Sequence, residues 1–442
     1  MRWWLPLLLS CACVPSASRE AFRAADLKAE LVSGSPPGLP LEDDQQWHIT
    51  LFGLHTTEGP WRYENVAALK ERTIYDGVQA RKLLRLAASR GVQVVVITDH
   101  NSLQAAFDKE LNQEAERLRV TLVSASEWSL GGPLTLNELP VTPGVAGPHA
   151  VLVGYQASRP SDVIAPPDTR LPGTDAQLVE MLNTVHARGG AAVLTHPNAL
   201  NADYPFATPL QFDLVEVDGP RLERPGQALS LWHGWLMDGY RLGAISSANW
   251  HGGRPTDNPF RHLNLVRART RTPGALAEAI RAGHVMVVAQ PEKRPRVLLG
   301  ADADEDGSFD DVREGDVMTP GPRQERARFQ VRVVGAEGRT LVLYTGASRE
   351  PAYREDMFEP EVVRSFSLAL MPERRTFVRA ELWNGTVRQV LTNPVYFEPL
   401  ARRPSTPDVR PKPEPEPQEP IRIITVPDRG APPDAGGYGV QP

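Results

Sequence analysis

Cysteine is almost absent from this 442-residue sequence. Both cysteines, Cys11 and Cys13, stand near the amino terminus, so the residues after them can form neither a disulfide nor a thiolate metal site. Any metal ion bound by the folded part of the chain must therefore be held by His, Asp, Glu or Asn side chains.

The sequence also lacks an excess of positive charge. Its 48 Lys and Arg residues are outnumbered by 54 Asp and Glu residues, and the basic residues are scattered rather than gathered in a stripe. A protein that binds phosphate backbones usually carries a basic patch. We therefore expect no nucleic-acid partner.

The apolar run at the amino terminus, MRWWLPLLLS, is too short to cross a bilayer as a helix. We predict that residues 1–17 are an export signal. The segment Leu8–Cys11 resembles a bacterial lipoprotein cleavage site, which would leave Cys11 as the lipid-carrying first residue; the alternative is a plain secretory peptide cut near Ala17. We expect the protein in the periplasm or cell envelope, with a lipid anchor in the first case.

Composition divides the rest of the chain into four segments. Residues 18–46 are rich in Ala, Ser and Pro and are predicted to be a linker. Residues 401–442 are rich in Pro and Glu with few aromatics, so we expect a disordered or polyproline tail. Between them, helical and strand patterns alternate over 47–290, and strand patterns follow each other over 291–400.

The alternating segment predicts an α/β fold. QARKLLRLAASRG has helical spacing and is followed by the apolar run VQVVVITDH, and the same unit recurs in DAQLVEMLNTVHARGG and AAVLTHP. Such repeats favour parallel βα units in a barrel or open sheet. Over 291–400 the alternation in RFQVRVV and FVRAELWNGTVRQVL, with a turn at Asn384 and Gly385, predicts a separate small β-sandwich-like domain.

Imidazole and carboxylate side chains follow the predicted strands, where βα folds place their chemistry. Each by itself is better explained as a solvated or hydrogen-bonded residue. Together they are typical of a metal site, because divalent ions take nitrogen and oxygen donors from separate strands. The candidates are His55, Asp76, Asp99, His100, Glu127, His149, His196, Asn249 and His251.

Four short motifs resemble those of the PHP family of metal-dependent hydrolases, in the same order and spacing. They are ITDHN at residues 97–101, SASEWS around Glu127, PHAVLVGY around His149 and LTHPN around His196. RTPGALAEAIRAGHVMV and LTNPVYF resemble the carbaryl-hydrolase-like branch (CehA/McbA). Over about residues 47–399 the resemblance implies a distorted (β/α)7 barrel, up to three metal ions, and a metal-bound hydroxide that attacks a phosphoester, amide or carbamate.

Two positions depart from the family pattern. The opening motif, which normally has two His flanking one residue, has Gly53 in place of the first His, and the closing motif has Asn249 in place of Asp. We align the family's next aspartate with Asp76, and Glu58 is the weaker alternative.

The resemblance implies one ion held by Glu127, His149 and His196, and a second held by Asp76, His100 and His251. A third ion would use His55 and Glu127 together with the two altered positions. We therefore expect one or two divalent ions (Zn, Mn or Fe) to bind tightly and the third weakly or not at all.

The resemblance therefore implies an exported metal-dependent hydrolase that acts on a small-molecule substrate, phosphorylated or amide-like. Asp99 is expected to orient His100, as the second nitrogen of a ligand His usually binds a carboxylate or carbonyl, and His251 completes the predicted catalytic pair. Arg254 is a candidate anion contact. The alternative is a catalytically impaired pseudoenzyme that acts as an envelope binding protein, which the changes at Gly53 and Asn249 favour.

Other patterns are given a structural interpretation. The loop Asp302–Gly307 imitates the start of a calcium-binding EF-hand, but Arg313 occupies the twelfth position and no flanking helix is predicted, so we interpret it as an exposed acidic loop. His186 and His284 are interpreted as structural. Trp232, His233 and Trp235 either line a substrate pocket or pack a helix against the barrel.

Overall fold

The computed structural model describes residues 30–31, 46–56, 75–128, 135–136, 139–140, 149–165, 174–199, 202–203, 208–220, 222, 225–251, 258–289, 295–321, 324–346, 348–371 and 374–399. All of these residues belong to one compact unit of the chain. The export signal, most of the linker, the tail, Glu58 and Arg254 lie outside the described residues. Among those that are described, no helix is long and apolar enough to cross a membrane.

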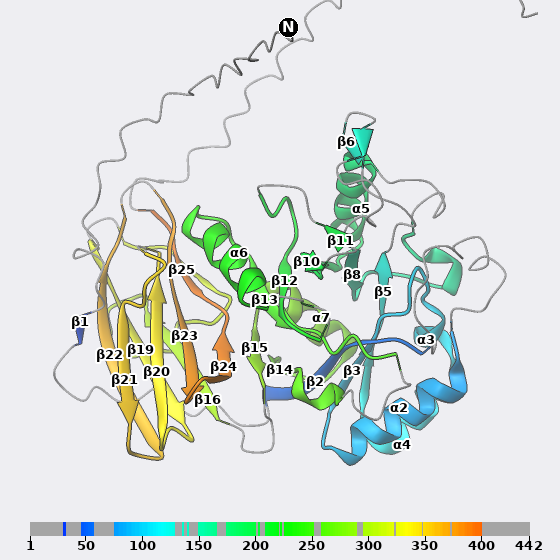
Figure 1. Ribbon diagram of the computed structural model, residues 1–442, viewed down its shortest axis with the longest axis horizontal. Coiled ribbons are helices and arrows are strands. Elements are labelled where there is room, and N and C mark those ends of the chain that lie inside the picture. The colour runs from blue at the N-terminus through cyan, green and yellow to red at the C-terminus, as the bar shows by residue number, and fades with distance from the viewer. Residues whose placement is uncertain are drawn as a thin grey trace, which may run out of the picture. The chain divides into compact units, whose positions relative to one another are not determined.

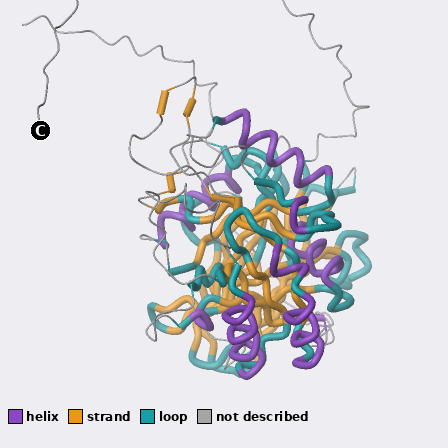
Figure 2. Tube along the Cα trace, turned by 90° about the vertical axis from the view of Figure 1, so that its right-hand side faces the viewer, coloured by secondary structure: helices purple, strands orange, loops and turns teal. Residues whose placement is uncertain are grey.

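The alternating segment forms helices around strands, as its sequence pattern predicts (Figures 1 and 2). Its principal strands are β2 (Trp47–Leu54), β3 (Val94–Ile97), β4 (Thr121–Val123), β5 (Ala125–Trp128), β8 (His149–Val153), β9 (Ala191–Thr195), β12 (Leu214–Asp218), β13 (Gly243–Ser246), β14 (Leu263–Arg267) and β15 (Val285–Val288). Its helices are α2 (Gly77–Ser89), α3 (Gln104–Phe107), α4 (Lys109–Leu118), α5 (Asp175–Ala187), α6 (Pro225–Met237) and α7 (Pro273–Ala282), with the 3-10 turns η4 (Pro160–Asp162) and η5 (Pro259–Arg261).

These strands belong to two sheets whose edges meet. One has the order β13-β12-β9-β8-β5, and the other includes β15-β14-β2-β3-β4. Hydrogen bonds from the amides of Ala248 and Trp250 to the carbonyls of Phe52 and Gly53 connect the chain after β13 to β2. On the other side, the amide of Glu127 in β5 donates to the carbonyl of Asp99 after β3. Residues that follow different strands are thereby brought to one common rim.

The prediction of parallel strands is wrong for two of them. β8 pairs antiparallel with both β5 and β9, and β14 pairs antiparallel with β2 and β15. The reversal of β8 has a functional consequence, because its first residue, His149, then reaches the rim formed by the carboxyl ends of its neighbours. Periodicity does not reveal strand direction.

The segment 291–400 is rich in strands, as predicted. They are β16 (Arg296–Asp302), β17 (Val312–Arg313), β18 (Val317–Met318), β19 (Arg326–Val334), β20 (Arg339–Thr345), β21 (Tyr353–Met357), β22 (Glu361–Ala369), β23 (Thr376–Asn384), β24 (Val387–Thr392) and β25 (Val395–Phe397). The predicted turn at Asn384 and Gly385 is confirmed, since β23 and β24 pair antiparallel across it. β24 also pairs with β15, so one sheet continues across the predicted boundary at residue 290.

Short strands complete the described structure. β6 (Thr135–Leu136) pairs with β7 (Leu139–Pro140), and β10 (Asn198–Ala199) pairs with β11 (Ala202–Asp203). β1 (Glu30–Leu31), inside the predicted linker, pairs antiparallel with β22. Part of the linker is therefore a strand, which its lack of periodicity did not indicate.

Helix α6 packs against the β-rich segment. Trp232 and Trp235 are buried in the core, and the indole of Trp232 donates to the carbonyl of Leu242. His233 lies 3.1 Å from the carbonyl of Ser348, and its Nδ1 accepts from the Arg379 guanidinium of β23. The burial of Trp232 and Trp235 therefore agrees with the packing interpretation of this aromatic run.

Candidate metal centre

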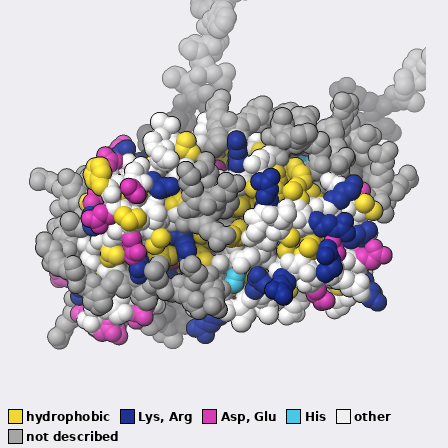
Figure 3. All heavy atoms as spheres, turned by 90° about the horizontal axis from the view of Figure 1, so that it is seen from below, with side chains coloured by type: hydrophobic (Ala, Val, Ile, Leu, Met, Phe, Trp, Pro, Cys, Tyr) yellow, Lys and Arg dark blue, Asp and Glu magenta, His cyan; other side chains and the backbone are white. Residues whose placement is uncertain are grey.

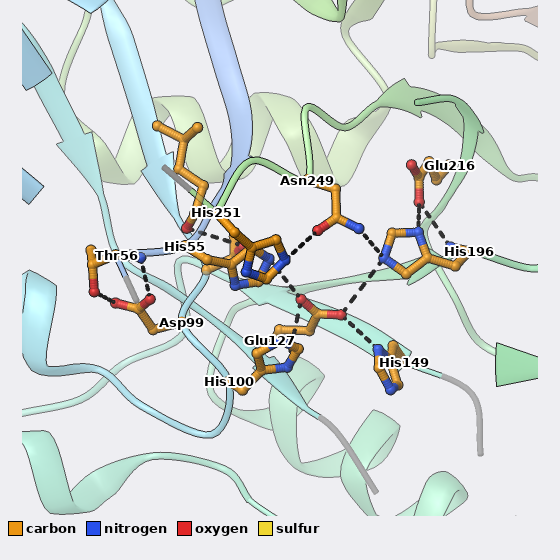
Figure 4. A network of polar contacts seen from close by, with 12 residues as sticks. His55, Thr56, Asp99, His100, Glu127, His149, His196, Glu216, Asn249 and His251 are labelled. Atoms are coloured by element: carbon orange, nitrogen blue, oxygen red, sulfur yellow. Dashed lines mark hydrogen bonds and ion pairs between the residues drawn. The ribbon is translucent and has the colours of Figure 1, made fainter. Parts of the chain in front are cut away.

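The rim where the two sheets meet carries most of the predicted ligands (Figure 4). Glu127 is the next-to-last residue of β5. Its backbone amide donates to the carbonyl of Asp99 and its carbonyl accepts from the amide of Asn101, so it is joined to the chain after β3. Five of the predicted ligands are buried, with exposed fractions of 2% for His55 and Glu127, 5% for His100 and His149, and 7% for His196, whereas Asn249 and His251 are partly buried. On the face seen in Figure 3, charged side chains of both signs are visible among the described residues.

The two oxygens of the Glu127 carboxylate face different imidazoles. Oε1 lies 2.9 Å from Nδ1 of His149 and 3.9 Å from Nε2 of His196. Oε2 lies 3.2 Å from Nε2 of His55 and 3.8 Å from Nδ1 of His100. The carboxylate therefore stands between two pairs of nitrogen donors.

A third imidazole extends the Oε2 side. The rings of His55 and His251 stack with centroids 4.2 Å apart, and His55 stacks on His100 at 4.7 Å. Ligand atoms of His55, His100 and His251 lie within 4.8 Å of one another, as do those of His100, Glu127 and His149. These five side chains supply both groups, and His100 is common to them.

The protonation of these groups suits metal binding. Burial lowers the pKa of His100 well below its usual value, although the Glu127 carboxylate acts in the opposite direction. Burial alone would raise the pKa of Glu127, but His100 and the hydrogen bond from His149 hold it well below its usual range. Neutral imidazole and ionised carboxylate are the forms that coordinate metals.

The donor set passes a further test of fit. The buried Nδ1 of His55 has no hydrogen-bond partner among the described residues. Buried polar atoms without partners are rare, and a bound ion is one ordinary explanation. Imidazole nitrogens and a carboxylate on separate strands suit zinc, manganese or iron, so the residues present fit divalent ions.

His196 is held by Glu216, which the sequence analysis did not select. The Glu216 carboxylate accepts the backbone amide of His196 at 2.8 Å, and the same oxygen lies 2.8 Å from His196 Nδ1. Glu216 is fully buried in β12. A carboxylate beside Nδ1 fixes the orientation of the His196 ring, so that Nε2 is the nitrogen available to a metal ion. A charged residue inside the apolar run of β12 was the available signal.

Asn249 connects the two sides of the centre. Its amide nitrogen lies 2.9 Å from Nε2 of His196, and its amide oxygen lies 3.0 Å from Nε2 of His251. Both His196 (φ 51°) and Asn249 (φ 38°) have positive φ, a strained conformation that non-glycine residues keep mainly at functional sites. The neutral amide thus engages two nitrogens that an ion could use.

Asp76 is not brought into the cluster. It is exposed and caps α2, with its Oδ1 accepting the amides of Val78 and Gln79. A carboxylate before a helix readily takes this role. In the described residues, His55 takes the place that the sequence analysis gave to Asp76 beside His100 and His251.

Asp99 has a different partner from the one predicted. Its two oxygens accept hydrogen bonds from the amide and Oγ1 of Thr56, at 2.7 and 2.8 Å. Burial raises the pKa of Asp99 to about 6, against the lowering effects of His55 and of these hydrogen bonds. Asp99 therefore fixes the segment that carries His55.

Gly53 occupies a position that leaves no room for the missing His. Its φ is +79°. A Cβ built there would lie 2.0 Å from Oγ of Ser247, 3.2 Å from the Ser247 Cβ and 3.3 Å from the backbone nitrogen of Asn249. The hydroxyl could rotate away, but the other two contacts would remain tight. The backbone conformation and the close neighbours at this position therefore favour glycine.

The histidines set aside by the sequence analysis have ion-pair partners elsewhere. Nε2 of His186 lies 2.9 Å from Asp213, and Nε2 of His284 lies 2.7 Å from Asp316. Hydrogen bonding to Asp213 raises the pKa of His186 despite partial burial. The ion pairs of His186 and His284 agree with their interpretation as structural residues.

Comparisons with known proteins add little to this picture. No family model and no curated protein matches the chain. Among solved structures, a proposed metal-dependent phosphoesterase from Bifidobacterium adolescentis aligns with 16% identity and a TM-score of 0.27, over 40% of this chain and 84% of that one. An amidohydrolase from Chromobacterium violaceum aligns with 12% identity and a TM-score of 0.29, over 47% and 91%. These likenesses are too weak to assign a function.

Proposed function

We propose that this chain is a metal-dependent hydrolase of the PHP type, in the carbaryl-hydrolase-like branch, built on a distorted seven-stranded barrel. The single observation that carries the proposal is the Glu127 carboxylate, whose two oxygens face separate pairs of imidazoles. Such an arrangement suits a carboxylate that bridges two ions. Zinc, manganese or iron would serve as the divalent ion.

Each side of Glu127 would hold one ion. Oε1 with His149 and His196 supplies one set of donors, and Oε2 with His55, His100 and His251 supplies the other. Bound divalent ions would lower the pKa of a coordinated water and polarise the scissile group. Glu216 keeps His196 in the tautomer that presents Nε2, and Thr56 with Asp99 fixes the segment of His55.

The substrate is proposed to be small and phosphorylated, or an amide, ester or carbamate. His251 is only partly buried, unlike the other imidazoles of the cluster, and so is the ligand best placed to meet a substrate. The third family site would lack both of its altered donors, since Gly53 has no side chain and Asn249 is uncharged. We also propose export through residues 1–17, either with lipid attachment at Cys11 or as a plain secretory protein cut near Ala17.

An assay tests this function. The purified chain, supplied with manganese or zinc, is given a panel of generic phosphomonoesters, phosphodiesters, carboxylic esters and carbamates. We expect turnover above that of a His196→Ala variant, because His196 would hold the ion on the Oε1 side. Equal melting temperatures of the metal-free proteins would show that the variant is folded.

A pseudoenzyme is the second candidate, and the hydrogen bonds of Asn249 favour it. They engage Nε2 of both His196 and His251, the atoms that an ion would need. In that case the chain would bind metal or an envelope component without hydrolysis. Turnover by the wild type that equals that of the His196→Ala variant on every substrate would support this candidate and overturn the hydrolase.

A further inference from the structure

The acidic loop between β16 and β17 brings together side chains that the sequence alone left as a surface feature. Carboxylate oxygens of Asp302, Asp304 and Asp306 lie within 4.8 Å of one another. Asp304 and Asp306 are exposed, whereas Asp302 is fully buried at the end of β16. Three like charges this close repel one another unless a cation lies among them.

The decisive feature is the buried carboxylate of Asp302. Its Oδ2 accepts the amide of Gly307 at 3.2 Å and lies 3.4 Å from Nη1 of Arg328. Its Oδ1 is buried and has no hydrogen-bond partner among the described residues. A buried oxygen left without a partner is destabilising, so a bound ion is a physical reason for this arrangement.

The frame of the loop is fixed although no EF-hand helices flank it. β16 and β17 pair antiparallel, with Ala301 opposite Val312, so the loop closes a hairpin. Phe309 is buried in the core and anchors the loop from within. The Asp311 carboxylate accepts the amide of Ala303 at 2.9 Å. The hairpin therefore supplies the support that helices give in an EF-hand.

We propose that this loop, residues 302–310, binds a calcium ion. Asp302, Asp304 and Asp306 occupy the first, third and fifth positions of a calcium loop, and Gly307, with φ +91°, makes the sharp turn at the sixth. Asp310 at the ninth position offers a fourth carboxylate. Arg313 at the twelfth position lies in β17 and contributes no carboxylate, so the site lacks the bidentate Glu of an EF-hand.

The ligand set indicates calcium rather than the ions of the histidine cluster. All its donors are oxygens, which hard cations prefer, and a loop open to solvent tolerates the irregular coordination of calcium better than the octahedron of magnesium. Without the twelfth-position Glu, we expect a dissociation constant of roughly 10⁻⁴–10⁻³ M, as in extracellular calcium modules.

Calorimetric titration of the full chain, with its histidine cluster already loaded with zinc, tests the site independently of hydrolysis. We expect one calcium ion per chain, a higher melting temperature in about 10 mM calcium, well above the expected dissociation constant, and a weaker response to magnesium. An Asp304→Asn, Asp306→Asn double variant should bind calcium at least about tenfold more weakly. Both residues are exposed, so the variant should fold.

Asp238→Asn is the matched control, since Asp238 is an exposed aspartate after α6. It removes one charge outside the loop and should leave calcium binding unchanged. The proposal is overturned if the wild type shows neither heat nor a shift in melting temperature, if the double variant binds as tightly as the wild type, or if magnesium binds as tightly as calcium.

Discussion

A Glu127→Gln variant is expected to lose its bound metal and its hydrolytic activity together. Glutamine keeps the size of the side chain but has one oxygen, so it cannot present acceptors to the imidazoles on both sides, and it removes the charge that balances two dications. We expect metal affinity to fall by more than the roughly 10–100-fold typical of an outer ligand partner. Elemental analysis after dialysis measures the loss.

Glu216→Gln is the matched comparison, because Glu216 is also buried on a strand and its carboxylate faces His196. The amide oxygen can still accept the backbone amide of His196, while the charge beside Nδ1 is lost. We expect metal affinity to fall by about 10–100-fold, with the same number of ions at saturation. If Glu127→Gln kept the full metal content, or if Glu216→Gln were the more damaging change, the bridging role of Glu127 would be wrong.

A Gly53→His variant is expected to destabilise the protein rather than restore a ligand. A side chain at φ +79° costs roughly 1–2 kcal/mol, and forcing it against Ser247 and Asn249 costs roughly a further 1–3 kcal/mol. The sum is a large share of the roughly 5–15 kcal/mol that stabilises a typical domain. The free energy of unfolding from urea titration measures the effect.

Gly91→His separates the two costs. Gly91 has a similar φ of +74°, but nothing lies within 4 Å of a Cβ built there. This variant should therefore lose only the roughly 1–2 kcal/mol of backbone strain. Equal losses at the two positions would show that Gly53 has room for a side chain, and a gain of bound metal in Gly53→His would contradict the account of the altered site.

The sequence predicted the elements of this fold well where the apolar pattern was regular. The helical spacing of QARKLLRLAASRG corresponds to α2, and the apolar run that follows it corresponds to β3. It did not reveal the reversed direction of β8 or the pairing of β24 with β15, because strand direction and pairing depend on residues far apart in the chain. The local pattern of apolar residues contains no information on strand direction or on strand pairing.

The sequence also selected most of the site. His55, His100, Glu127, His149, His196, Asn249 and His251 do lie together, because each lies at the rim end of a strand or just beyond it. Asp76 was selected by its spacing from Asp99, but spacing could not show that its carboxylate caps α2. The partnership of Thr56 with Asp99 was likewise invisible, since it depends on the orientation of two side chains.

Glu216 is a supporting residue of the site that the sequence could have indicated. It interrupts the apolar run of β12, and burial of a carboxylate requires a partner. That partner, His196, precedes it by 20 residues. A charged residue inside a strand that follows a ligand strand is therefore a useful signal for support of that ligand.

Anomalous scattering at the metal edge from crystals of the full chain tests the central claim most directly. Two peaks are predicted, one beside Oε1 of Glu127 among His149 and His196, and one beside Oε2 among His55, His100 and His251. Peaks found only elsewhere in the protein, or none at this carboxylate after incubation with zinc or manganese, would contradict the account.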